Sequence, residues 1–233
     1  MIIDTHLHVV DPWTLDYPWL ATVPALNQAW PYASYELEAR RAGISRTLHM
    51  EVDVAPARIE DETSYIATLA HRPDSLIAGA IASCRPEETE FAAYLERQRS
   101  NPLVKGFRRV LHVMPDELSE QPLFRDNIKR MSGSGLTFDL CVLPHQLPNA
   151  MALADLAPDV TFILDHCGVP DIKGDARQPW QDSITELAKR PNVIAKISGV
   201  VAYADPDTWI ADTLRPWVEH TISSFGWDRV VWG

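Results

Sequence analysis

Three residues near the start of the chain have types and spacing that could do chemistry. Asp4, His6 and His8 alternate in the segment Asp4-Thr-His6-Leu-His8. Residues two apart in a β-strand share a face, so we expect these three side chains to point the same way. Imidazoles bind divalent transition metals and can polarise a carbonyl group. The segment therefore predicts a metal-binding or catalytic face, although an HxH pair alone also arises by chance.

A third imidazole follows a later apolar run. Asp165 and His166 come directly after Val160-Thr-Phe-Ile-Leu164. If both segments end strands of one barrel, His166 reaches the same rim as His6 and His8. Three histidines at one barrel mouth favour a functional interpretation over core histidines with satisfied hydrogen bonds.

The elements that must position these residues are short, apolar and β-branched. Successive runs begin 24 to 42 residues apart, which is the length of a strand with a crossover helix. The pattern predicts an α/β fold, a (β/α)8 TIM barrel, as a single domain over residues 1–233. A doubly wound sheet is the alternative, but no GxGxxG follows the first run. The runs begin near Ile2, Ile44, Ser75, Val104, Leu136, Val160, Val193 and Arg229.

Helix signals fill the intervals between these runs. Ser34 is a candidate N-cap and Gly43 a stop signal for the first helix, and Pro216 is expected to kink the last. The expected helices span residues 34–41, 60–71, 87–99, 126–131, 147–157, 180–189 and 208–225.

The connection after the first strand is unusually long. Residues 9–33 are rich in Pro, Trp and Tyr and have neither helical nor strand periodicity. Long loops in compact domains are usually functional or disordered, and the aromatic content argues against disorder. In a barrel this loop lies on the active-site face. We expect it to form a wall or lid over a pocket, or else a flap that only plugs the barrel.

Charge and composition exclude several classes of protein. With 21 Lys and Arg against 32 Asp and Glu, the formal net charge is −11, which disfavours nucleic acid and anionic membranes as partners. Three scattered cysteines predict a reducing, cytoplasmic compartment. We expect neither a signal peptide nor a membrane span. The expected partner is a small-molecule substrate, and the oligomeric state is left open.

Taken together, these motifs resemble the amidohydrolase superfamily. Within it they are most similar to the amidohydrolase-2 branch that includes pyrone-dicarboxylate lactonase, sulfomuconolactone hydrolase and fuconolactonase. The resemblance covers the whole chain and implies a hydrolase on a TIM barrel. It is carried by the segments IDTHLHVVDP, LDYPWL, VKGFRRVL, ILDHCGVPDI, AKISGV and VVWG.

The resemblance also implies roles for individual residues. His6, His8 and His166 become the catalytic or metal-binding imidazoles, Arg108 the strand-4 arginine and Lys196 the strand-7 lysine. Arg108 suits a bidentate clamp on a substrate carboxylate, with a salt bridge at the rim as the alternative. The adjacent Arg109 could instead be the inward-facing residue. Lys196 lies within an apolar run, where it serves catalysis or an internal ion pair.

Other candidates are weaker. Glu51 could bind the substrate or a metal or transfer a proton, or it could be a solvated loop carboxylate. The same alternatives hold for Asp53 and Asp139. Trp19 in the long loop is a candidate substrate contact. Two cysteines near strand ends, Cys141 and Cys167, are expected to be small core residues. No GxSxG elbow supports a serine nucleophile.

The chain departs from the family pattern at two places. The pattern continues after strand 8 with Trp-Gly-Ser-Asp-Trp-Pro, whose Asp is the expected general base, whereas this sequence reads Trp232-Gly233. We therefore expect a barrel truncated after strand 8. The fifth run lacks the superfamily histidine, the nearest imidazole being His145. A two-metal centre is not expected, and the alternatives are one zinc-like divalent ion or none.

Three functions remain open from the sequence. The first is hydrolysis of a lactone of a small anionic or sugar-derived compound by water attack. The second is metal-dependent decarboxylation of a small carboxylic acid, which a sister branch carries out with similar histidines. The third is a catalytically impaired binding barrel, if the chain ends at Gly233.

Overall fold

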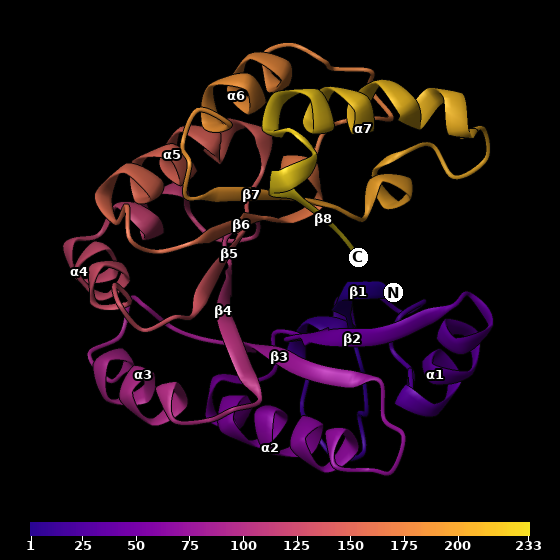
Figure 1. The fold of residues 1–233 in the computed structure, drawn as a ribbon, viewed down its shortest axis with the longest axis vertical. Helices are drawn as coiled ribbons and strands as arrows, with labels where there is room; N and C mark the ends of the chain where they lie inside the picture. Colours follow the sequence, from indigo (N-terminus) through magenta and orange to yellow (C-terminus); the bar gives the residue numbers. More distant parts are fainter.

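A computed structural model describes residues 1–233 and shows eight parallel strands in sequential order (Figure 1). Each strand pairs with the next through a crossover on the outside, which is the arrangement of a (β/α)8 barrel. This confirms the predicted fold. The strands are β1 Ile2–Leu7, β2 Ile44–Met50, β3 Ile77–Ser83, β4 Val104–Val110, β5 Thr137–Cys141, β6 Phe162–Leu164, β7 Val193–Ile197 and β8 Val230–Trp232.

Seven helices occupy the intervals and form the outer layer (Figure 1). Short 3₁₀ turns precede or follow several of them. None of the helices combines the length and apolar character that a membrane span needs. The helices are α1 Tyr32–Arg41, α2 Ile59–Ala70, α3 Phe91–Arg99, α4 Pro122–Arg130, α5 Leu147–Leu156, α6 Trp180–Leu187 and α7 Ala211–Phe225.

Helix starts differ most from the sequence prediction. Ser34 is not an N-cap, because α1 begins at Tyr32 directly after Pro31. Helix α3 begins at Phe91 rather than residue 87, and α4 begins earlier than expected, at Pro122. A proline at the first helical position has no N–H to leave unpaired, so Pro122 is a natural start.

The main hydrophobic core lies between the strands and the helices from α3 to α7. Aromatic rings dominate it, with Phe107, Phe138 and Phe162 on the outer faces of β4, β5 and β6. Trp180 of α6 and Trp217 of α7 pack with ring centroids 4.9 Å apart. Because these outward-facing residues are apolar, the alternate positions that face the barrel interior are free to be polar.

The barrel is nearly closed between its first and last strands. No backbone ladder joins β1 to β8, but the Thr5 hydroxyl donates a hydrogen bond to the carbonyl of Trp232 at 2.7 Å. Strands β1 and β8 also lie next to each other in Figure 1. The end of β1 is thereby brought beside the ends of β6 and β7, where the candidate functional residues lie.

Candidate active site

The two histidines of the first motif lie at the carboxyl end of β1. Their Nε2 atoms are 3.2 Å apart. The Nδ1 atom of His8 is 3.0 Å from the carbonyl oxygen of Met50. Because a carbonyl only accepts hydrogen bonds, neutral His8 carries its proton on Nδ1 and presents the lone pair of Nε2 toward His6.

Asp4 does not join these histidines. Its Oδ2 accepts a 2.7 Å hydrogen bond from the hydroxyl of Tyr35 in α1, and its Oδ1 accepts one from the backbone N–H of His6. The β1–β2 register is irregular between Asp4 and Leu7. The expectation that Asp4, His6 and His8 share one face is therefore wrong for Asp4, since a regular period of two does not hold across this irregularity.

His166 sits on a left-handed turn that follows β6. The φ angles of His166, Cys167 and Val169 are +55°, +54° and +50°. This conformation is unfavourable for residues with a side chain, most of all for β-branched Val169. Two hydrogen bonds hold the turn: Trp180 Nε1 donates to the Cys167 carbonyl at 2.8 Å, and His166 Nδ1 lies 2.9 Å from Ser198 Oγ. The unfavourable backbone conformation therefore occurs at the turn that sets the direction of the His166 side chain.

Buried charges connect the strands beneath the histidines. Lys196 Nζ donates to Asp139 Oδ2 at 2.6 Å and to Asp165 Oδ1 at 2.8 Å. It also lies 3.4 Å from His6 Nδ1. The side chains of Lys196, Asp139 and Asp165 are each at most 2% exposed. The geometry of Lys196 is that of an internal ion pair, the alternative that the sequence left open.

Arg108, not Arg109, faces the barrel interior. Its Nε donates to Glu51 Oε1 at 2.5 Å, and its Nη2 donates to the Glu51 carbonyl at 2.7 Å. Its Nη1 lies 3.4 Å from Asp165 Oδ2. Arg109 pairs with Glu87 on the outside of the barrel at 2.7 Å. Glu51 is thus a buried partner of the guanidinium and does not line the pocket described below.

The environment of the imidazoles favours their neutral forms. Burial lowers the pKa of His166 to about 3, although Asp165 opposes the shift. Burial also lowers the pKa of His6, again against Asp165. His8 is accessible from the pocket, and its enclosure by protein atoms, together with His6, lowers its pKa well below the ordinary value. Neutral imidazoles have a free lone pair for a metal ion or a proton.

The two carboxylates around Lys196 are shifted in opposite directions. Burial raises the pKa of Asp139 to about 7, despite the nearby ammonium. Burial opposes ionisation of Asp165 too, but Lys196 and then His6 hold its pKa well below the ordinary value. Asp165 is therefore the permanent anion of the cluster. One oxygen of Asp139, Oδ1, is buried without a hydrogen-bond partner.

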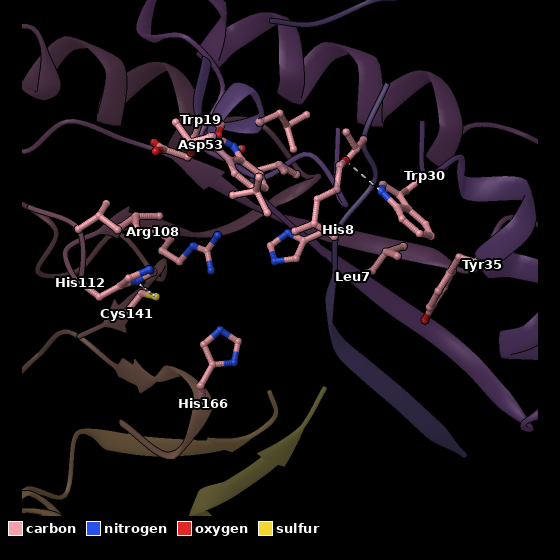
Figure 2. A pocket seen from close by; sticks show the side chains of 18 of the residues that line it. Leu7, His8, Trp19, Trp30, Tyr35, Asp53, Arg108, His112, Cys141 and His166 are labelled. Atoms are coloured by element: carbon pink, nitrogen blue, oxygen red, sulfur yellow. Dashed lines mark hydrogen bonds between the residues drawn. The ribbon is translucent and has the colours of Figure 1, made fainter. Parts of the chain in front are cut away.

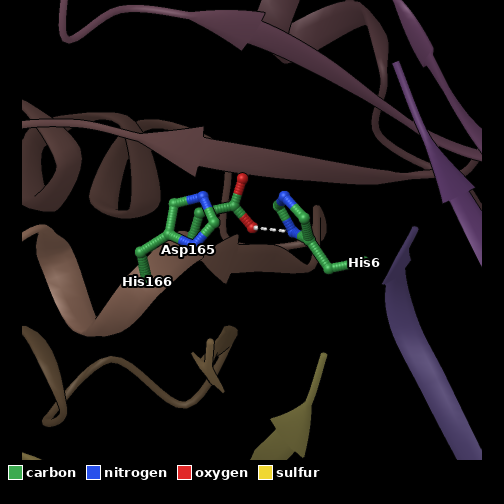
Figure 3. Close-up of side chains that lie close together, drawn as sticks. All are labelled: His6, Asp165 and His166. Atoms are coloured by element: carbon green, nitrogen blue, oxygen red, sulfur yellow. Dashed lines mark ion pairs between the residues drawn. The ribbon is translucent and has the colours of Figure 1, made fainter. Parts of the chain in front are cut away.

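His6, Asp165 and His166 converge in a way that fits one divalent ion (Figure 3). One potential ligand atom from each lies within 4.8 Å of the others. The 3.2 Å gap between the Nε2 atoms of His6 and His8 also suits two ligands of one ion with metal–nitrogen distances of about 2.1 Å. Both oxygens of Asp165 already contact cations, which favours imidazole over carboxylate ligation.

A pocket of about 810 Å³ opens above this floor (Figure 2). His8, His166 and Arg108 lie at its polar side, and Figure 2 shows their side chains directed into the same space. Residues of the long connection after β1 form much of the remaining lining, including Trp19, whose Nε1 donates to the Val52 carbonyl at 2.9 Å. Other lining residues are Leu7, Val10, Leu20, Thr22, Val23, Leu26, Trp30, Pro31, Ser34, Tyr35, Val52, Asp53, Val110, His112, Val113 and Cys141.

Sequence reasoning missed one pair in this pocket. Cys141 at the end of β5 was expected only as a core residue, but it lines the pocket with its Sγ 3.0 Å from His112 Nδ1. Burial raises the pKa of the Cys141 thiol to about 12, so the sulfur remains protonated. His112 follows β4 by two residues, and strand-end position is the signal that could have identified it. Cys167 is buried, as expected.

Comparison with known proteins places this geometry in context. An L-fucono-1,5-lactonase from Burkholderia ambifaria is 28% identical over 235 residues, covering 99% of this chain and 78% of that protein. A zinc-bound amidohydrolase structure from Burkholderia multivorans has a TM-score of 0.87 at 22% identity, covering 100% of this chain and 83% of that one.

A more distant structure shares the fold. The manganese-bound 5-carboxyvanillate decarboxylase from Novosphingobium aromaticivorans has a TM-score of 0.65 at 15% identity, covering 100% of this chain and 85% of that one. The sequence model of the Amidohydrolase family (Amidohydro_2) matches residues 3–233. The chain therefore belongs to the amidohydrolase family, the branch that its histidine motifs resemble.

Proposed function

We propose that this protein hydrolyses a lactone, the cyclic ester of a small molecule, by attack of water. The observation that carries the proposal is that the imidazoles of His8 and His166 and the guanidinium of Arg108 are directed into the same part of one pocket (Figure 2). The lactonase name of a relative with 28% identity supports the same reaction.

The residues of the chain divide the work of ester hydrolysis. His8 and His166 offer ring nitrogens to the substrate carbonyl or the attacking water. Arg108 provides a fixed positive charge near the point where the carbonyl oxygen gains negative charge, which stabilises the transition state. Asp165 Oδ1 lies 3.6 Å from His6 Nδ1 and is the acceptor that faces a proton on this nitrogen, which leaves the Nε2 lone pair of His6 directed toward His8.

We further propose that His6, His8 and His166 hold a single zinc-like divalent ion. The support is the facing pair of Nε2 atoms, the neutral state of the rings, and zinc in a structure of the same fold. Such an ion supplies Lewis-acid polarisation and a more acidic water when bound. Titration of chelator-treated protein with zinc should show one site, weakened at least about 100-fold by His166→Asn and unchanged by His145→Asn, a matched change at an exposed histidine.

Decarboxylation is the less supported reaction. Its support is a decarboxylase structure that shares the fold at 15% identity, whereas the lactonase relative is 28% identical. The pairing of Arg108 with the side chain and carbonyl of Glu51 weakens the expectation of a carboxylate clamp at Arg108. The three cysteines are free and buried, which suits the reducing, cytoplasmic compartment that we propose for this protein.

The test is turnover by the purified chain on a panel of lactones, followed with a pH indicator and with zinc supplied. We expect hydrolysis of at least one lactone, reduced at least about 100-fold by His166→Asn and less than about threefold by His145→Asn. Release of CO₂ from aromatic carboxylic acids, without turnover of any lactone, would contradict the proposal.

A further inference from the structure

Much of the pocket wall is apolar. It comes largely from the connection between β1 and α1, which contributes Leu20, Val23, Leu26 and Trp30. Figure 2 shows the ring of Trp30 across the pocket from Arg108. A ligand whose carbonyl reaches His8 must place the rest of its surface against these side chains.

The polar atoms of this wall are already used within the protein. Trp19 Nε1 donates to the Val52 carbonyl at 2.9 Å, and Trp30 Nε1 donates to the Leu26 carbonyl at 3.3 Å. The hydroxyl of Thr22 donates to the Trp19 carbonyl at 2.8 Å. These residues therefore present rings and methyl groups to a ligand.

Several polar groups elsewhere on the lining are also paired, the exposed Ser34 hydroxyl being an exception. The Tyr35 hydroxyl donates to Asp4, and the Cys141 thiol contacts His112. Asp53 Oδ1 accepts from Arg85 at 3.1 Å. A hydroxyl-rich ligand would find few free partners, and each of its buried, unpaired hydroxyls costs roughly tenfold in kcat/KM.

We infer that the substrates are lactones with an apolar aryl or alkyl substituent, not hydroxyl-rich sugar lactones. This inference rests on the lactone hydrolysis proposed above and defines its substrate class. The lactone carbonyl lies at His8 and His166, while the apolar substituent fills the space lined by Leu26 and Trp30.

The test compares three probes on the zinc-supplied protein: dihydrocoumarin, δ-decalactone and D-galactono-1,4-lactone. After subtraction of spontaneous hydrolysis, we expect kcat/KM for at least one of the first two to exceed that for the sugar lactone at least about tenfold. Equal or faster turnover of the sugar lactone overturns the substrate class and leaves lactone hydrolysis intact. No turnover of any probe overturns both.

A pair of matched variants locates the preference. Leu26 lines the pocket and is 43% exposed, so Leu26→Asn should fold. Leu37 on α1 is 54% exposed and does not line the pocket, which makes Leu37→Asn the control. We expect Leu26→Asn to reduce the preference for apolar lactones at least about fivefold, and Leu37→Asn to leave it unchanged. An unchanged preference in Leu26→Asn overturns the assignment of this wall to the substrate.

Discussion

The Nε atom of Arg108 lies 2.5 Å from Oε1 of Glu51, and both side chains are almost completely buried. The guanidinium that the sequence offers to a substrate carboxylate is thus paired with a carboxylate inside the barrel, although Arg108 remains charged and still lines the pocket. Burial lowers the pKa of Arg108, but the negative charge of Glu51 raises it by more. The guanidinium therefore stays charged. This pair connects the end of β2 to the interior of β4 and sets the charge of the pocket floor.

Glu51→Gln should destabilise the fold strongly. The change removes the charge that compensates buried Arg108, and loss of one partner from a buried ion pair costs about 3 kcal/mol. Glu38→Gln removes the exposed partner of Arg41 and should cost less than about 0.5 kcal/mol. Urea unfolding at pH 7 measures both, and equal losses in the two variants would contradict the buried pairing.

Lys196→Met should destabilise the protein more at pH 8 than at pH 5. Without the ammonium, Asp139 and Asp165 face each other as buried carboxylates. The pKa of Asp139 is already raised to about 7, so in the folded variant it takes up a proton as the pH falls, whereas in the unfolded chain it remains ionised. Stability is therefore regained at low pH.

The expected loss for Lys196→Met is about 3 kcal/mol at pH 8, and at least about 1 kcal/mol less at pH 5. Lys129→Met, which removes a surface partner of Asp126, provides the matched control without this pH dependence. A pH-independent loss for Lys196→Met would show that the lysine contributes through packing alone.

His166 should make the fold sensitive to acid. Its pKa is lowered to about 3 by burial, so the unfolded chain binds a proton below about pH 6.5 while the folded chain does not. Its contribution to stability is present above pH 6.5 and is lost as the pH falls toward 3. Between pH 6.5 and 5 the loss is about 2 kcal/mol.

His166→Gln should remove this part of the acid sensitivity. Urea unfolding of metal-free protein at pH 7 and pH 5 measures the difference, with His145→Gln as a control at an exposed histidine. If His166→Gln and the unmodified chain lose the same free energy of unfolding between the two pH values, the imidazole is not held neutral by burial.

Trp180→Phe should loosen the left-handed turn that carries His166. The variant loses the hydrogen bond from the indole to the Cys167 carbonyl, worth about 1 kcal/mol. The Val169 amide, which donates to the His166 carbonyl within the turn, should exchange its hydrogen about fivefold faster. Trp217→Phe makes the same change in the adjacent ring of the core and should leave this exchange rate nearly unchanged.

The sequence alone determined the strands and their order. Strand positions followed from local apolar runs, because burial on both faces imposes the same composition on every parallel strand. It also determined that His6, His8 and His166 lie at one rim, since the carboxyl ends of all barrel strands meet there. Helix starts were less predictable, as Ser34 shows, because several residues near a helix start can cap it.

Only the tertiary structure decided the partners of the charged residues. Arg108 pairs with Glu51, and Lys196 with Asp139 and Asp165, across 31 to 57 positions of the chain. These pairings depend on how the barrel closes and on which charged groups are buried next to one another. No local periodicity in the sequence encodes them. The same closure placed apolar side chains of the long connection in one pocket with His8 and His166, and this defines the shape and polarity of the pocket.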